Sequence, residues 1–137
     1  MPLPKNTYGI DTSIFLRLLT GHPQKDFEAT SAALVKLHND EPSTELVVSN
    51  QVIAEAYFAL QHHYEVSKKS AQTAILNVLT SGMIRALNGQ KVIEILKSRS
   101  GAGLADWLIA QDYSAQDCQT LTNDKRMAKV PDVRLLT

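Results

Sequence analysis

The sequence has 137 residues, of which 44% are hydrophobic and 20% charged, and its formal net charge is zero. This composition is typical of a folded globular protein rather than a disordered one, and the length predicts a single domain over residues 1–137. Zero net charge argues against a protein that holds nucleic acid through a general basic surface. It does not exclude a nuclease whose contacts with nucleic acid are local and mediated by a metal.

Cysteine content and hydropathy restrict the kinds of site and the cellular location that we expect. Cys118 is the single cysteine, which excludes an intramolecular disulfide and a cysteine-rich metal site, and its place near an expected strand predicts a small core residue. No apolar run approaches the roughly 18 residues of a membrane span, and residues 1–5 lack the apolar core of a secretory signal. We therefore expect a cytoplasmic protein with no membrane association.

Helical and extended patterns alternate along the chain, bounded by capping residues and breakers such as Asp11, Gly21, Asn50 and Gly82. In chain order we expect a strand at 8–10, a helix at 12–20, a helix at 27–39, a strand at 46–48, a helix from its cap Asn50 to about 64, a helix from 67 or 68 to about 81, a strand at 83–87, a helix through 92–96, a helix containing Asp106, a strand at 119–122, a helical turn at 125–129 and a strand at 133–136. Strands separated by helices pair in parallel through crossovers, which predicts an α/β sandwich.

Four carboxylates stand at the edge of, or inside, apolar segments, where a carboxylate is costly unless something compensates it. They are Asp11, Glu55, Asp106 and Asp124. Asp11 and Asp124 each follow an expected strand, and sites in open parallel sheets form at the carboxyl ends of strands. Ser13 and Thr122 are short hydroxyl residues at the same expected edge, available to bond to the acids or to act simply as capping and strand residues.

Each of the four acids also has a purely structural explanation. Asp11 equally serves as the cap of the first helix, and Asp124 as a turn or cap residue. Glu55 and Asp106 are harder to explain in this way, because neither has a cation three or four residues away on its helix. A distant Lys or Arg partner remains the alternative for those two acids.

If the fold gathers the four carboxylates, they form an all-oxygen site suited to a hard divalent cation. Clustered carboxylates repel one another, and a bound cation would reverse that repulsion. One or two ions would then orient a water, lower its pKa and stabilise the charge that develops on a phosphodiester. The pattern therefore indicates a metal-dependent nuclease.

Other polar groups carry weaker signals. His62 and His63 are adjacent rather than spaced along one helical face, so a zinc site is disfavoured and a solvated helix end is expected. Lys125, Arg126 and Lys129 form a small basic group beside Asp124, which suits either RNA phosphates or a solvated helical face. Nucleotide-binding glycine loops are absent from the sequence.

In four segments the chain resembles the PIN-domain family, most closely the VapC-type toxins of bacterial and archaeal toxin–antitoxin pairs. The matching segments are Ile10-Asp11-Thr12-Ser13, Val52-Ile53-Ala54-Glu55, the eight residues from Gly103 through Asp106 to Ala110, and Leu121-Thr122-Asn123-Asp124-Lys125. Each motif is common by itself. Their shared order and comparable spacing make the set far more specific, and the resemblance covers essentially the whole chain.

The resemblance implies a three-layer α/β/α sandwich with a central, mostly parallel sheet of about five strands. It implies a ribonuclease that uses Mg²⁺ or Mn²⁺, frequent homodimers and inhibition by a cognate antitoxin. By position, Asp11, Glu55, Asp106 and Asp124 would form the catalytic acidic cluster, with Asp11 and Asp106 as principal metal ligands. Ser13 or Thr122 would be supporting polar residues.

One departure from the family pattern bears on the metal count. Some relatives carry a further acid just after the last motif, where this chain has Met127 and Ala128, so a second metal site is in doubt. Asp112 and Asp117 are alternatives for a peripheral acidic role, but neither lies in a matching motif.

Three other functions compete with an RNA endonuclease toxin. The same machinery suits RNA processing outside a toxin system, and a non-catalytic PIN-like binding module is a further alternative. A phospho-acceptor receiver domain is also a doubly wound sheet with acids at strand ends. It needs an acidic pair after the first strand and an acceptor aspartate after a middle strand, whereas Asp11 is single and Val48-Ser49-Asn50 contains no acid.

Overall fold

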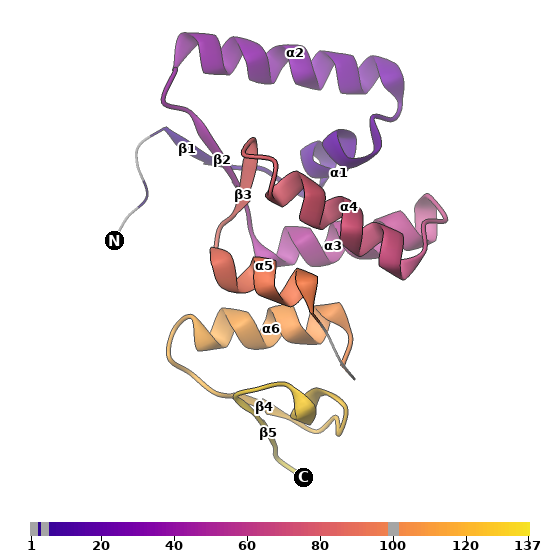
Figure 1. Cartoon of the computed structure of the whole chain (residues 1–137), viewed down its shortest axis with the longest axis vertical. Helices are drawn as coiled ribbons and strands as arrows, with labels where there is room; N and C mark the ends of the chain where they lie inside the picture. The colour runs from indigo at the N-terminus through magenta and orange to yellow at the C-terminus, as the bar shows by residue number, and fades with distance from the viewer. Residues whose placement is uncertain (1–2, 4–5, 99–101) are drawn as a thin grey trace. The chain divides into compact units, whose positions relative to one another are not determined.

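The computed structural model describes residues 3, 6–98 and 102–137, and the chain divides into two compact units, Met1–Leu87 and Asn88–Thr137 (Figure 1). The expectation about localisation used residues 1–5, and of these the structure describes only residue 3. Within them, strands and helices follow the expected order, with small shifts at their ends. No helix in the described ranges has the length and apolarity needed to cross a membrane.

The first unit is built on a parallel sheet with the strand order β1-β2-β3. Its elements are β1 (Thr7–Gly9), α1 (Thr12–Thr20), α2 (Gln24–Asp40), β2 (Glu45–Val48), α3 (Asn50–His63), α4 (Lys68–Leu79) and β3 (Ile84–Ala86). Tyr8 pairs with Leu46, which pairs with Ile84. Leu46, Val47 and Val48 of the central strand are all buried, as expected of a strand covered on both faces.

Side-chain caps set the starts of three helices in the first unit. Asp11 caps α1, Ser49 caps α3 and Ser67 caps α4. The expectation that Asn50 caps α3 is wrong. Ser49 has extended backbone and its hydroxyl accepts the Val52 N–H at 3.2 Å, whereas Asn50 is already helical and is buried.

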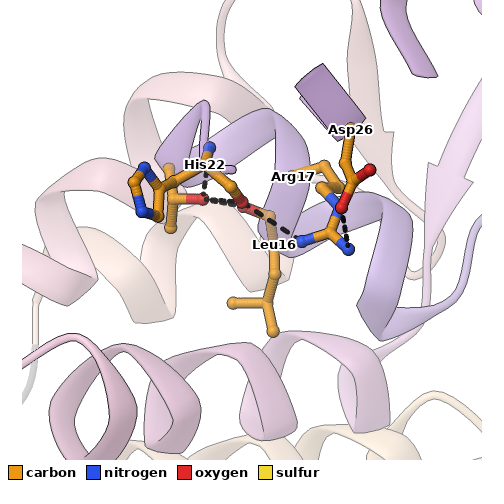
Figure 2. Close-up of polar contacts among 5 residues, drawn as sticks. Leu16, Arg17, His22 and Asp26 are labelled. Carbon is orange, nitrogen blue, oxygen red and sulfur yellow. Dashed lines mark hydrogen bonds and ion pairs between the residues drawn. The ribbon is translucent and has the colours of Figure 1, made fainter. Parts of the chain in front are cut away.

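The junction between α1 and α2 is held by polar contacts of Arg17 (Figure 2). Gly21 ends α1 with a φ of 63°, a left-handed conformation that glycine adopts without strain. Arg17 Nη1 donates to the His22 carbonyl at 3.1 Å, and Arg17 Nη2 lies 3.3 Å from Asp26 Oδ2. These contacts connect the end of the first helix to the start of the second.

The second unit contains two helices and a small parallel sheet. Its elements are α5 (Gln90–Lys97), α6 (Leu104–Ser114), β4 (Thr120–Thr122), the 3₁₀ turn η1 (Met127–Lys129) and β5 (Val133–Leu135). A cluster of buried Ala102, Ala110 and Val130 packs with Trp107 and Val133. This cluster fixes α6 against the chain that leads from η1 into β5.

Two expectations about the fold need correction. The α/β class with parallel pairing is confirmed, but the described strands form sheets of three and two rather than one sheet of five. The chain returns through η1, so β4 pairs with its sequence neighbour β5. Cys118 is exposed rather than in the core, because it lies in the turn that ends α6, where its N–H donates to the Tyr113 carbonyl at 3.0 Å.

Candidate functional site

Asp11 lies where β1 passes into α1, at the carboxyl edge of the three-stranded sheet. Its Oδ1 accepts the Ser13 hydroxyl at 2.6 Å and the Ile14 N–H at 3.3 Å. The structural explanation offered by the sequence is therefore correct, since Asp11 caps α1. The same position exposes its carboxylate to solvent, so the capping bonds do not bury the group.

The hydrogen bonds of Asp11 also favour its charged form. The Ser13 hydroxyl, and after it the Ile14 N–H, hold the pKa of the Asp11 carboxyl below its ordinary value. Burial acts in the opposite direction and is outweighed. Asp11 is consequently ionised throughout the physiological range and needs no deprotonation to act as a ligand.

Glu55 lies in the second turn of α3 and is exposed. The burial cost that its apolar neighbours predict does not arise, because Ile53, Ala56, Tyr57 and Leu60 occupy the buried face of the helix. Its Oε2 accepts the hydroxyl of Thr12 at 3.2 Å. Thr12 and Ser13 both lie in the first turn of α1, so this turn contacts both candidate acids of the first unit, Asp11 and Glu55.

Thr12 is absent from the site residues predicted from the sequence, although it lies in the first of the four matching motifs. The one available signal was its position between Asp11 and Ser13, two residues assigned to the site. Nothing local indicates its partner, because Thr12 and Glu55 are 43 positions apart in the chain. Packing of α1 against α3 brings the two side chains together.

Asp106 lies in the first turn of α6 and is half-buried. Its carboxylate has no hydrogen bond or ion pair with any residue in the described ranges 3, 6–98 and 102–137. The N-cap residue of this helix is Gly103, which supplies no side-chain cap. Asp106 is therefore an acidic residue in the first turn of a helix that has no side-chain cap.

Asp124 follows β4 and is exposed. Its Oδ1 accepts the Arg126 N–H at 2.8 Å and the Met127 N–H at 3.4 Å, and its own N–H donates to Thr122 Oγ1 at 3.0 Å. The predicted turn role is thus present. Thr122 contacts the backbone of Asp124 rather than its carboxylate, whereas Ser13 contacts the carboxylate of Asp11 directly.

The four acids are divided between the units, with Asp11 and Glu55 in the first and Asp106 and Asp124 in the second. Of the described side chains, no group of three His, Cys, Asp or Glu residues forms a metal cage within either unit. Mg²⁺ is usually held by one or two carboxylates and keeps several waters. Asp11 and Glu55 are both exposed and supply carboxylate oxygens, the ligand type that such a cation takes.

The other candidates behave as solvated groups. His62 and His63 are exposed at the end of α3, as expected, and the ring of His62 stacks on Phe58 at 6.4 Å. Lys125, Arg126 and Lys129 are also exposed. Asp112 accepts the Asn88 side chain at 2.9 Å, and Asp117 is exposed with a φ of 59°.

A family comparison decides which family this arrangement belongs to. The model of the PIN domain matches residues 8–133. The chain belongs to the PIN-domain family. The match includes all four acids, together with Ser13 and Thr122, and runs through both units. It also removes the basis for the receiver-domain alternative.

Further comparisons with known proteins are sparse for this PIN domain. No curated protein matches it. Among solved structures, the crystal structure of VapBC2 from Rickettsia felis bound to a DNA fragment from their promoter is similar at 18% sequence identity with a TM-score of 0.41. That similarity covers 95% of this chain and 97% of the other chain.

Two cavities in the PIN domain are lined by residues other than the four candidate acids. The first unit has one of about 650 Å³, lined largely by apolar residues of α2 and by residues of α1, β2, α4 and the turn before β3, including Leu34, Val35 and Met83. The second unit has one of about 620 Å³ at α5, α6 and residues 130–132. Neither lining contains any of the four acids.

Proposed function

We propose that this PIN domain is a metal-dependent endoribonuclease whose catalytic acids are Asp11, Glu55, Asp106 and Asp124. The observation that carries the proposal is the first turn of α1, where Asp11 accepts the Ser13 hydroxyl while the adjacent Thr12 holds Glu55. Two carboxylates from separate helices are thereby tied to one helical turn at the carboxyl edge of a parallel sheet. Family membership supports nuclease chemistry at these acids.

The residues have distinct roles in this proposal. Asp11 is an ionised ligand, because its capping bonds lower its pKa. Glu55 is a second oxygen donor, and Asp106 supplies a half-buried carboxylate with no competing partner in the described chain. Mg²⁺ or Mn²⁺, when bound, would polarise the phosphodiester and lower the pKa of the attacking water. Asp124 completes the set, and metal stoichiometry decides between one ion and two.

The first experiment measures cleavage of a structured RNA with added Mg²⁺ or Mn²⁺, and again with excess chelator. We expect cleavage only with the free metal. Asp106→Asn and Asp11→Asn should strongly reduce cleavage, while the matched control Asp117→Asn should retain it, since Asn tolerates the left-handed backbone at 117. Cleavage in excess chelator would contradict the metal mechanism.

We further propose that this nuclease is a VapC-type toxin, cytoplasmic, homodimeric and inhibited by a cognate antitoxin. The ordered set of four motifs supports this role. Expression should arrest growth, Asp106→Asn should not, and co-expression of a neighbouring small gene product should restore growth. Active enzyme without growth arrest would instead favour an RNA-processing nuclease, which is the second candidate in the same class.

A non-catalytic PIN-like module makes a different prediction. Isothermal titration calorimetry of the wild-type chain with Mn²⁺ should show no binding in that case. We expect binding, with a stoichiometry that gives the number of ions. Loss of that binding in Asp11→Asn, with retention in Asp117→Asn, would place the ion at the acids.

A further inference from the structure

We propose that Thr12 is a positioning residue that fixes the Glu55 carboxylate for metal binding. The inference deepens the proposed function and rests on it. It assigns a role to a side chain outside the four acids, whose hydroxyl donates to Glu55 Oε2. Thr12 acts through Glu55 and has no contact with substrate in this scheme.

The contact joins a rigid donor to a flexible acceptor. Thr12 is the first residue of α1, directly after the cap Asp11, so its backbone is fixed by the helix start. Its branched Cβ restricts its rotamers, and the side chain is half-buried. Glu55 is exposed and has three rotatable side-chain bonds, so its carboxylate needs an external contact to be held in place.

The hydrogen bond leaves Glu55 competent as a ligand. An ionised carboxylate has about four lone-pair sites, and the Thr12 hydroxyl occupies one of them at 3.2 Å. The next residue, Ser13, does the same for Asp11 at 2.6 Å. Consecutive hydroxyls in one helical turn thus orient two carboxylates that belong to different helices.

A purely structural link between α1 and α3 is the competing explanation. Such a link would stabilise the fold without changing metal affinity once the protein is folded. The two explanations separate when unfolding free energy and Mn²⁺ affinity are measured on the same variants. Thr20 provides a matched control, because it lies at the other end of α1 and its hydroxyl donates to the Leu16 carbonyl at 2.8 Å.

The test compares Thr12→Val, Thr12→Ser and Thr20→Val by calorimetric titration with Mn²⁺. Thr12→Val removes the hydroxyl and keeps the shape, and we expect an about 10-fold loss of affinity, at the low end for loss of a group that orients a ligand. Thr12→Ser keeps the donor and should stay within about twofold of wild type. Thr20→Val should lower stability in urea without changing Mn²⁺ affinity. Thr12→Ala gives the same expectation as Thr12→Val if the valine variant does not fold.

A double-mutant cycle with Glu55→Ala shows whether Thr12 acts through Glu55. In the Glu55→Ala background, Thr12→Val should cause no further loss of Mn²⁺ affinity. Equal losses in both backgrounds, or wild-type affinity in Thr12→Val, would overturn the inference. Absence of Mn²⁺ binding and RNA cleavage in the wild type would instead refute the proposed function, so the two failures are distinct.

Discussion

The two units differ in the hydrogen bonds that their candidate carboxylates make. In the first, Asp11 caps α1 and Glu55 accepts the Thr12 hydroxyl, so both carboxylates have hydroxyl donors. In the second, Asp124 accepts two backbone N–H groups, while half-buried Asp106 has no partner among the described residues. A carboxylate that is needed for folding tolerates only substitutions that keep its bonds. A carboxylate without such bonds can be substituted with little effect on folding, so Asp106 tests the proposed metal-binding role most directly.

The largest expected effect is that of Asp106→Asn, the substitution of the acid that has no side-chain partner among the described residues. We expect kcat/KM for RNA cleavage to fall about 10³-fold, which corresponds to several kcal/mol of lost charge stabilisation. The unfolding free energy should change by less than about 1 kcal/mol, because only the favourable interaction with the helix dipole is lost. Urea unfolding and a fluorescent RNA assay measure both. Full activity in this variant would remove Asp106 from the site.

A pair of substitutions at Asp11 separates its role as a helix cap from its proposed role as a metal ligand. Asn caps helices as well as Asp does, so Asp11→Asn should keep the melting temperature while lowering cleavage about 10²-fold through the lost charge. Asp11→Ala should lower both cleavage and melting temperature. Thermal unfolding and the RNA assay distinguish the outcomes. Equal activity of Asp11→Asn and wild type would leave Asp11 as a cap alone.

Asp124 provides the corresponding test in the second unit. Asp124→Ala removes the acceptor of the Arg126 and Met127 N–H groups and should cost about 1 kcal/mol of unfolding free energy, as loss of a cap does. Asp124→Asn should recover most of that loss. If urea unfolding finds the two variants equally stable, the turn does not depend on this side chain.

The smallest expected effect is a pH dependence that arises from Asp11. Its pKa is lowered in the folded state, mainly by the Ser13 hydroxyl. The resulting stability is present above the ordinary Asp pKa of about 3.9 and is lost as the pH falls through the lower folded-state value. Ser13→Ala should therefore lower unfolding free energy near neutral pH and narrow its difference from wild type under acid conditions. A difference that stays constant from pH 6 to pH 2 would contradict this origin.

Features set by residues close together in the sequence were the easier ones to predict. The Asp11 cap and the Gly21 stop bound a helix whose limits, Thr12–Thr20, match the expectation from sequence. Asn50 was a wrong choice of cap because Asn and Ser are both good caps, and only the extended backbone of Ser49 decides between them. The prediction that Cys118 is a core residue near a strand is wrong because the turn after α6 includes Cys118, and β4 begins only at Thr120.

By itself, the sequence determined the order of helices and strands, the four-acid pattern and membership of the PIN-domain family, since caps, periodicity and motif order are local properties. Tertiary structure decided the partner of Glu55. Packing of α1 against α3 brings Thr12 to Glu55, and the helical face of Glu55 is exposed because apolar neighbours fill the other face. Those outcomes depend on contacts between segments far apart in the chain, which no local pattern encodes.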